Sequence, residues 1–389
     1  MRSKNYTILA IDTSCDETAV AVTVDNRVIS NVISSQVELH KKWGGVVPIL
    51  AQRAHRERID AVIAEALKRA AKYQISKIKY QKYKSNIKNL LNQINVIAVT
   101  IGPGLAPALE VGIAKAKELA KKYNKPLIAV NHMEGHLLSP FARNAAGKGS
   151  TISELFSQAR QGRATTETTT TTRVATTPFP LLGLLVSGNH TELVLVDNIG
   201  GYILLGETLD DAAGEAFDKV GRMLEIGYPG GPIIELLAKS GDSYTYDLPV
   251  PMRQRKDLNF SYSGIKTALL YLTRDLKRQE KYDKKTICDL AASFQRVVSS
   301  SLTDKLIIAV EQYKPKGILL GGGVISNLTI RRDIRKAMRK YKIPVYLPYS
   351  KKLFTDNAAM IGVAAYFKVQ RGEFVENIDG LDRQPNLSL

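Results

Sequence analysis

The sequence predicts an α/β protein made of two related halves. Short apolar runs typical of buried strands alternate with longer segments in which apolar residues recur at helical spacing. Two strand–turn–strand patterns are found, at 6–33 and at 181–196, and each turn carries two hydroxyl residues four positions apart. These residues are Ser14 with Thr18, and Ser187 with Thr191. The match predicts a duplicated domain with two corresponding loops, although two unrelated hairpins would produce it as well.

The first half is expected to open with an antiparallel meander. Its strands are Tyr6–Ile11, Ala19–Val24 and Val28–Ile33, with a turn at Asp25-Asn26. The elements that follow are a long helix, a strand, a second helix and a short buried strand: Val47–Tyr73, Val96–Thr100, Ala106–Lys122 and Pro126–Asn131.

The second half is expected to repeat the strand–turn–strand opening of the first. Its strands are Leu181–Val186, Leu193–Val196, Gly317–Leu320 and Pro344–Leu347, with a helix from near Asn327. We expect a first lobe of residues 1–134 and 355–389, a flexible insertion over 140–180, and a second lobe over 181–354. The insertion has few large apolar residues and contains the run Thr168–Thr172.

The composition favours a polyanionic partner. Lysine and arginine exceed aspartate and glutamate by 55 − 37 = 18, so nucleic acid is the first candidate, and a lysine-rich composition without such a partner is the alternative. The two cysteines, Cys15 and Cys288, form no CxxC motif, which fits a reducing cytoplasm. The first apolar stretch is broken at Asp12, so we expect no signal peptide, and no run approaches the roughly 18 apolar residues of a membrane span.

Residues 68–93 include a strongly basic stretch. Lys68 to Lys88 contains eight basic residues and no acidic one, and Tyr73, Tyr80 and Tyr83 lie between them. An RNA-facing surface with stacking rings would have this composition. A solvated helix pair with half-buried tyrosines would have it too, and the sequence slightly favours that second interpretation.

The segment His132-Met-Glu-Gly-His136 predicts a metal site. Residues four apart share one helix face, close enough for two imidazoles to bind one cation, and the helix would begin at the end of a strand. Two unrelated histidines on a helix are the alternative. Zinc proteases have the same histidine spacing, but in HExxH the glutamate follows the first histidine directly. Glu134 comes one place later, so it would point elsewhere and a protease is not favoured.

A metal held by two histidines needs a carboxylate, and Asp356 is the candidate. It follows the strand Pro344–Leu347 and precedes the last long helix, where an N-cap aspartate would be the ordinary local interpretation. The remaining histidines, His40, His55 and His190, are not spaced as ligands, and His55 is expected on a helix surface or facing a partner.

Polar loops at three strand ends predict a nucleotide site. Asp12 would ligate or bridge a metal near phosphates, and donors to phosphate would come from Thr13, Ser14, Ser187 and Gly188, with Gly321–Gly323 as the third part. Each loop alone is a weak signal, because serine-rich turns are common.

The segment Asp210–Lys219 begins with acids that would cap its own helix. Asp218 lies too late in the helix for capping and is the candidate acceptor for ribose hydroxyls. Gly231, in the tight loop Tyr228–Pro232, is suited to lie against a ligand, although a plain turn fits equally.

Taken together, these motifs closely resemble the universal tRNA threonylcarbamoyladenosine transferase family of the bacterial TsaD type, whose members were once called sialoglycoprotein endopeptidases. The resemblance spans nearly the whole chain apart from the basic stretch 68–93 and the insertion 140–180. The matching segments are Asp12–Thr18, Gly44–Pro48, Arg53–His55, Gly102–Leu105, His132–His136, Asp210–Lys219, Tyr228–Pro232, Phe260–Lys266, Gly321–Asn327 and Thr355–Asn357.

The resemblance implies the duplicated RNase H-like fold of actin, sugar kinases and heat-shock ATPases. It implies transfer of threonylcarbamoyl from threonylcarbamoyl-AMP to N6 of the adenosine 3′ of the anticodon, in tRNAs that read codons beginning with A. His132, His136 and Asp356 would hold one divalent metal, iron(II) first and zinc as the alternative, and Asp12 would assist. Residues implied to bind the adenylate are Leu185, Val186, Ser187, Gly188, Asn189, Asp218, Gly231 and Asn327.

The implied partners are tRNA, a related paralogous subunit and a small ATPase, with no membrane. Two residues depart from the family pattern: Asn189 stands where a second glycine is usual, and Phe354 where a cysteine is usual. Asparagine tolerates positive φ, but its side chain would crowd the adenylate. An ATP-dependent phosphotransferase of the same fold is disfavoured by the histidine pair, and a non-catalytic scaffold by retention of all three ligands.

Overall fold

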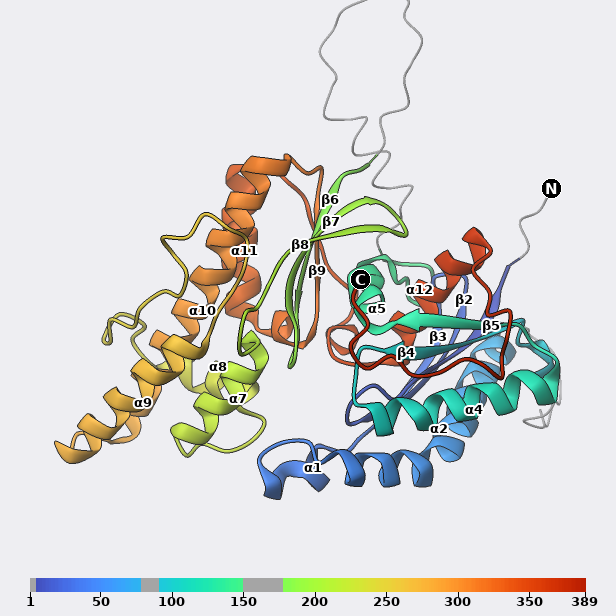
Figure 1. Cartoon of the computed structure of the whole chain (residues 1–389), viewed down its shortest axis with the longest axis horizontal. Helices are drawn as coiled ribbons and strands as arrows, with labels where there is room; N and C mark the ends of the chain where they lie inside the picture. The colour runs from blue at the N-terminus through green and yellow to red at the C-terminus, as the bar shows by residue number, and fades with distance from the viewer. Residues whose placement is uncertain (1–4, 78–90, 150–177) are drawn as a thin grey trace, which may run out of the picture. The chain divides into compact units, whose positions relative to one another are not determined.

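The computed structural model describes residues 5–77, 91–149 and 178–389 (Figure 1). Tyr80, Tyr83 and most of the expected insertion, including Thr168–Thr172, lie outside these described residues. The chain forms two compact units, one of residues 1–150 with 348–389 and one of residues 151–347.

The first unit is built on a five-stranded sheet in the order β3-β2-β1-β4-β5. The first three strands form the expected antiparallel meander, and the last two run parallel to β1. Their bounds are β1 Thr7–Asp12, β2 Glu17–Val24, β3 Arg27–Ser35, β4 Val96–Gly102 and β5 Leu127–Asn131.

Helices cover both faces of this sheet (Figure 1). One face packs on α2 and α4, where side chains such as Leu9 and Ile11 of β1 enter the core. The other face packs on α12, whose Gly362 lies so close to Thr23 that an added Cβ would be 2.7 Å from its methyl group. The helices are α1 Val37–His40, α2 Pro48–Lys77, α4 Ala106–Tyr123, α5 His132–Leu138 and α12 Ala358–Arg371.

The second unit repeats the topology of the first. Its sheet has the order β10-β9-β6-β7-β8, again a three-stranded antiparallel meander followed by two parallel strands. This equivalence confirms the predicted duplicated RNase H-like fold. The strands are β6 Leu181–Val186, β7 Thr191–Asn198, β8 Gly201–Glu207, β9 Ile318–Gly321 and β10 Val345–Tyr346.

The second unit also contains the long helices α9 and α10, which the motif analysis had not assigned. The helices are α7 Ala213–Met223, α8 Gly230–Leu237, α9 Ser263–Arg278, α10 Lys284–Tyr313 and α11 Leu328–Lys340. Short 3₁₀ helices in the two units are Lys41–Trp43, Ser139–Phe141, Ala238–Ser240, Gly323–Ser326 and Lys351–Leu353. None of the helices in the described residues combines the length and the apolar composition that a membrane-spanning helix needs.

Two glutamates face each other across the β7–β8 pair and predict a pH-dependent stability. Glu192 lies directly opposite Glu207; burial first, and the charge of Glu207 second, raise the pKa of Glu192 to about 7. This carboxyl ionises more easily in the unfolded chain, so stability is lost as pH rises from about 4.5 to about 7. After a discount for partial exposure, we expect Glu192→Gln to raise the free energy of unfolding by about 1–2 kcal/mol at pH 8. Denaturant unfolding at pH 8 and pH 4 measures this, and an equal gain at both would contradict the electrostatic cause.

Candidate metal centre

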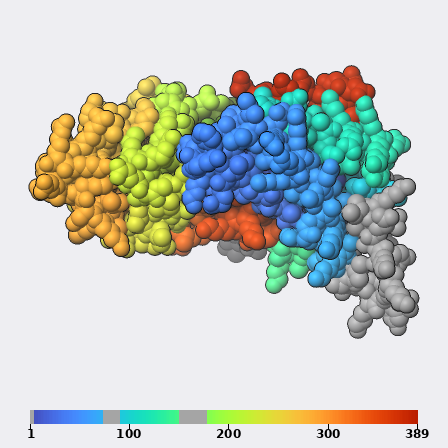
Figure 2. Space-filling view, turned by 90° about the horizontal axis from the view of Figure 1, so that it is seen from below, coloured from blue at the N-terminus to red at the C-terminus, as the bar shows by residue number. Residues whose placement is uncertain are grey.

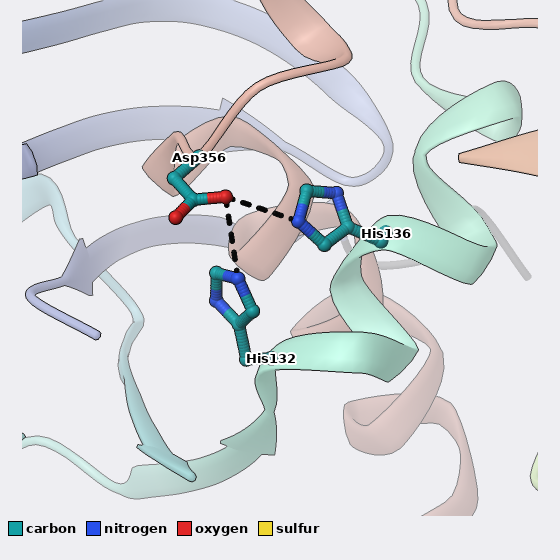
Figure 3. A group of neighbouring side chains, drawn as sticks. All are labelled: His132, His136 and Asp356. Atoms are coloured by element: carbon teal, nitrogen blue, oxygen red, sulfur yellow. Dashed lines mark hydrogen bonds and ion pairs between the residues drawn. The ribbon is translucent and has the colours of Figure 1, made fainter. Parts of the chain in front are cut away.

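Two histidines and an aspartate converge in the first unit (Figure 3). Nε2 of His136 lies 3.1 Å from Oδ1 of Asp356, and Nε2 of His132 lies 3.4 Å from the same oxygen. One candidate ligand atom from each residue lies within 4.8 Å of the other two, and among the described residues this is the group of three found with such geometry. The structure therefore brings together the three residues that the sequence had proposed.

The start of α5 determines the positions of the two histidines. The strand β5 ends at Asn131, whose side-chain oxygen accepts hydrogen bonds from the backbone N–H groups of Met133 (2.7 Å) and Glu134 (3.3 Å). This N-cap begins the helix at His132, so His132 and His136 fall one turn apart on the same face. Both histidines are buried.

Asp356 does not cap α12, because the neighbouring residue Asn357 does so. The side chain of Asn357 caps α12 by accepting a hydrogen bond from the Met360 N–H at 3.1 Å. The alternative interpretation of Asp356 as the N-cap is therefore wrong, because Asn357 is the N-cap residue. Its carboxylate points to the histidines instead (Figure 3).

Asp12 lies beside this group rather than within it. The end of β1 places its Oδ2 atom 3.6 Å from Nδ1 of His132, the ring nitrogen that faces away from Asp356. Both atoms are buried, and neither has a hydrogen-bond partner in the described part of the chain. A histidine that binds a metal through one nitrogen usually donates from the other to a carboxylate, and this pair has the composition of such an arrangement.

The carboxylates govern the protonation of the histidines. Burial lowers the pKa of His132, but Asp356 and then Asp12 outweigh it and raise the pKa to about 10. At His136 burial prevails, with help from the charge of His132, so its pKa is lowered. Burial opposes ionisation of Asp356, yet the two imidazoles hold its pKa below the usual range. A divalent cation must displace the proton from His132, so metal binding weakens as the pH falls.

The donor set fits a divalent transition metal. Two imidazole nitrogens and one carboxylate oxygen suit iron(II) and zinc, which bind such atoms at about 2.0–2.2 Å. Three protein ligands leave further coordination positions for substrate. The positions of Asp12 Oδ2 and His132 Nδ1 support this fit. If a metal bound Nε2 of His132, the proton of the ring would be on Nδ1, where it faces the Asp12 carboxylate.

Glu134 does not point at the histidines, as its position in the motif predicted. Its buried carboxylate lies 3.3 Å from Arg371 Nη2 and 3.8 Å from Lys368 Nζ, both at the end of α12. The two cations also pair with Glu373. A carboxylate engaged in this way cannot activate water at the histidine pair, which excludes the zinc-protease arrangement.

The environment of His55 differs from the predicted one. The expectation of a surface or partner-facing residue was wrong, since His55 is wholly buried. Its Nδ1 accepts a hydrogen bond from the Thr18 hydroxyl (2.8 Å) and its Nε2 donates to the carbonyl of Cys15 (3.0 Å), a tautomer assigned from this network. Burial lowers the pKa of His55, in keeping with a neutral ring. It therefore holds the loop that follows Asp12.

Two hydroxyls of that loop have different surroundings. The Thr13 hydroxyl donates to the carbonyl of Ala108 at 2.9 Å, so it is engaged within the first unit. The Ser14 hydroxyl is buried, and no described residue forms a hydrogen bond with it. Of the two predicted phosphate donors, Ser14 is thus the one whose side chain has unused capacity.

In the second unit the end of β6 and the turn between β6 and β7 together carry five of the eight predicted adenylate residues. Leu185 and Val186 are buried in the strand, and Ser187 accepts a hydrogen bond from the His190 N–H at 3.1 Å. Gly188 and Asn189 are exposed, and an added Cβ at Gly188 would meet nothing within 4 Å. Asn189 is not among the residues with positive φ, so the turn does not depend on the left-handed tolerance of asparagine.

The acids before α7 do not cap that helix. Its N-cap is Ala212, without a side-chain hydrogen bond. Asp210 accepts hydrogen bonds from Ser261, shortly before α9, and from Ser263, the first residue of α9. Asp211 accepts from Lys219 (2.6 Å) and Lys266 (2.7 Å). The capping interpretation was therefore wrong, and Lys266 gains a role in joining α9 to α7.

Of the remaining predicted residues, Gly231 and Asn327 lie at helix starts, and Asp218 lies inside α7 and bonds to the start of α8. Asp218 Oδ1 accepts a hydrogen bond from the Gly230 N–H at 2.7 Å. Gly231 lies in the first turn of α8 rather than in a loop, as that helix begins at Gly230. Asn327 caps α11 through its oxygen and donates to Gln295 at 2.6 Å through its nitrogen.

Comparisons with known proteins agree with this fold and site. A sequence profile described as TsaD, tRNA N6-adenosine threonylcarbamoyltransferase, matches residues 27–149 and 163–363. The chain is 41% identical to a tRNA N6-adenosine threonylcarbamoyltransferase of Dictyoglomus turgidum, over 94% of each chain. It is 42% identical to one of Clostridium perfringens, over 98% of each chain.

A solved structure supports the fold alone. The crystal structure of HypF from T. kodakarensis has a TM-score of 0.52 and 12% sequence identity. The match covers 97% of this chain and 49% of that chain, so the present chain spans about half the length of HypF.

The fold and the site define an enzyme class, that of the duplicated RNase H-like proteins with a buried His–His–Asp group suited to a metal. Within that class the chain belongs to the TsaD family of tRNA N6-adenosine threonylcarbamoyltransferases, as the full-length matches show. The predicted family and the predicted type of enzyme, an acyltransferase, are confirmed.

Proposed function

We propose that this chain transfers the threonylcarbamoyl group from threonylcarbamoyl-AMP to N6 of the adenosine 3′ of the anticodon, in tRNAs that read codons beginning with A. N6 attacks the carbonyl carbon and loses a proton, the bond from that carbon to the phosphate oxygen breaks, and AMP leaves. The convergence of His132, His136 and Asp356 in a family of this activity is the observation that carries the proposal.

These three residues would hold one divalent metal, iron(II) in preference to zinc. When bound, the metal supplies a Lewis acid beside the carbonyl or phosphate oxygens of the adenylate. The chain itself fixes the direction of the two imidazoles through the cap on α5, and Asp12 stabilises the tautomer of His132. The buried hydroxyl of Ser14 supplies a donor toward phosphate.

The adenylate is proposed to contact the β6–β7 turn and the helix starts of the second unit. At Gly188 and Gly231 an added Cβ would meet nothing closer than 3.9 Å, so the backbone there can be approached by a ligand. Asp218 is the ribose acceptor in this proposal and also orders the start of α8. The amide of Asn327 is engaged in the cap and with Gln295, so we expect this residue to shape the site.

The proposed macromolecular partner is tRNA, met in the cytoplasm. The net charge of +18 supports it, and α11 carries six basic residues and one acidic residue. Five of the basic residues of α11 are exposed: Arg332, Arg335, Lys336, Arg339 and Lys340. A related paralogous subunit and a small ATPase are further proposed partners, and a separate enzyme would make the adenylate.

The proposal is tested by incubating the purified chain with threonylcarbamoyl-AMP and unmodified tRNA, with and without the paralogous subunit and the ATPase. We expect threonylcarbamoyladenosine in the digested tRNA and one AMP released per modified nucleoside, both measured by liquid chromatography with mass spectrometry. Absence of the modified nucleoside in every mixture would favour a scaffold. Consumption of ATP with phosphorylation of a small molecule would favour the phosphotransferase.

A further inference from the structure

The end of the chain lies against the strand ends that carry the metal centre. After α12 the chain runs along α4, where the Lys117 ammonium donates to the carbonyl of Asp379 at 2.9 Å (Figure 2). It then reaches the carboxyl ends of β4 and β5, with its terminus beside α5 (Figure 1). We call residues 384–388 the C-terminal strap.

The strap is hydrogen-bonded to both sides of the turn Gly102-Pro103-Gly104. The Gln384 N–H donates to the carbonyl of Ile101 at 2.7 Å, and the Gly104 N–H donates to the carbonyl of Pro385 at 3.0 Å. A Cβ at Gly102 would lie 1.8 Å from the carbonyl oxygen of Gln384, so only glycine permits this approach.

The same turn packs against the loop that follows Asp12. The Leu105 N–H donates to the carbonyl of Ser14 at 2.8 Å, and a Cβ at Gly104 would lie 2.5 Å from that carbonyl oxygen. The turn is thus enclosed between the strap on one side and the loop beside the metal centre on the other.

The strap also contacts the residue that begins the metal-bearing helix. Asn131 donates from Nδ2 to the carbonyl of Ser388 at 2.9 Å, while its Oδ1 accepts the two N–H groups that open α5. The bond to Ser388 fixes which way the Asn131 amide faces. Since α5 has only seven residues, its geometry depends on such contacts rather than on intrinsic helix stability.

We propose that the C-terminal strap is a positioning element for the metal centre, acting on His132 and His136 through Asn131. This inference rests on the proposed metal site. The alternative is that the end of the chain only completes the hydrophobic core of the first unit, because Leu381 and Leu387 pack against that core. The two roles differ in their consequences: a positioning role changes metal affinity, whereas a packing role changes only stability.

The test measures the dissociation constants of Zn²⁺ and Co²⁺ by chelator competition, together with the visible spectrum of the Co²⁺ form and the melting temperature. Asn131→Asp keeps an acceptor for the helix cap but replaces the donor to Ser388 with an oxygen. Deletion of residues 384–389 removes the strap itself. Lys121→Ala is the matched control, because it loosens the chain at Asp379 and leaves the strap untouched.

We expect roughly tenfold weaker metal binding and an altered Co²⁺ spectrum in Asn131→Asp and in the deletion variant. The two changes combined should weaken binding no more than either alone, because they break the same connection. Lys121→Ala should bind metal within twofold of the wild type. Binding within twofold in both strap variants, with only the melting temperature lowered, would overturn the proposal.

A second measurement uses the wild-type protein, so it does not depend on whether a variant folds. The folded, metal-loaded protein is trimmed by a serine carboxypeptidase, and the rate of Zn²⁺ release to a chromogenic chelator is followed. Release should accelerate several-fold once Ser388 is removed, and an unchanged rate would overturn the proposal. If the wild-type protein binds neither ion, the metal site itself is wrong and the inference falls with it.

Discussion

Replacing His136 with alanine is expected to remove both metal binding and transferase activity. His136 is fully buried, and its Nε2 lies 3.1 Å from Asp356 Oδ1, so the substitution removes one of the three proposed ligands from the group. Loss of one of three protein ligands should weaken metal binding by at least about 100-fold. Metal content after dialysis and the yield of modified nucleoside measure the two effects.

The control must separate this loss from damage to the fold. His40 is also a buried histidine of the first unit, and its ring contacts Gln36 Oε1 (3.2 Å) and the Val47 N–H (3.3 Å), away from the metal group. We expect His40→Ala to lower the melting temperature by an amount similar to His136→Ala while it retains metal. If His136→Ala gave as much modified nucleoside as the wild type, the metal would have no part in the reaction.

The two histidine ligands could be predicted from the sequence, and the third could be proposed but not settled. Four-residue spacing fixes the relation of His132 to His136 once a helix forms. Asp356 is 220 residues from His136, and only the packing of α12 onto the sheet brings it there. Locally, Asp356 and Asn357 are both good caps, and the backbone of α12 decides which of them is used.

The burial of His55 was missed although a signal for it exists. His55 lies four residues from both Ala51 and Ile59, on the apolar face of α2 that packs on the sheet. The charged neighbours Arg53 and Arg58 favoured a surface position for His55, whereas the helical spacing of the apolar residues indicates the buried face. Asp210 was misjudged for another reason, since its partners in the segment before α9 are about 50 residues away.

Asp12 is expected to contribute to metal affinity without ligating the metal. Its Oδ2 faces His132 Nδ1 at 3.6 Å, and neither atom has a hydrogen-bond partner among the residues that the structure describes. Asn is nearly isosteric and keeps the oxygen that accepts from the Ser14 N–H, but it removes the charge that favours a proton on Nδ1. We therefore expect Asp12→Asn to weaken Zn²⁺ binding about 10- to 100-fold, less than His136→Ala, with little change in melting temperature.

The comparison of Asp12→Asn with Asp12→Ala makes this prediction specific. If the carboxylate acts through His132, both variants lose affinity to a similar degree, because neither can accept the Nδ1 proton as an anion. If Asp12 instead bound the metal directly, the amide oxygen of asparagine would retain part of the affinity that alanine loses. Affinity unchanged in both variants would mean that the orientation of His132 comes from the α5 cap alone, and that Asp12 serves the substrate rather than the metal.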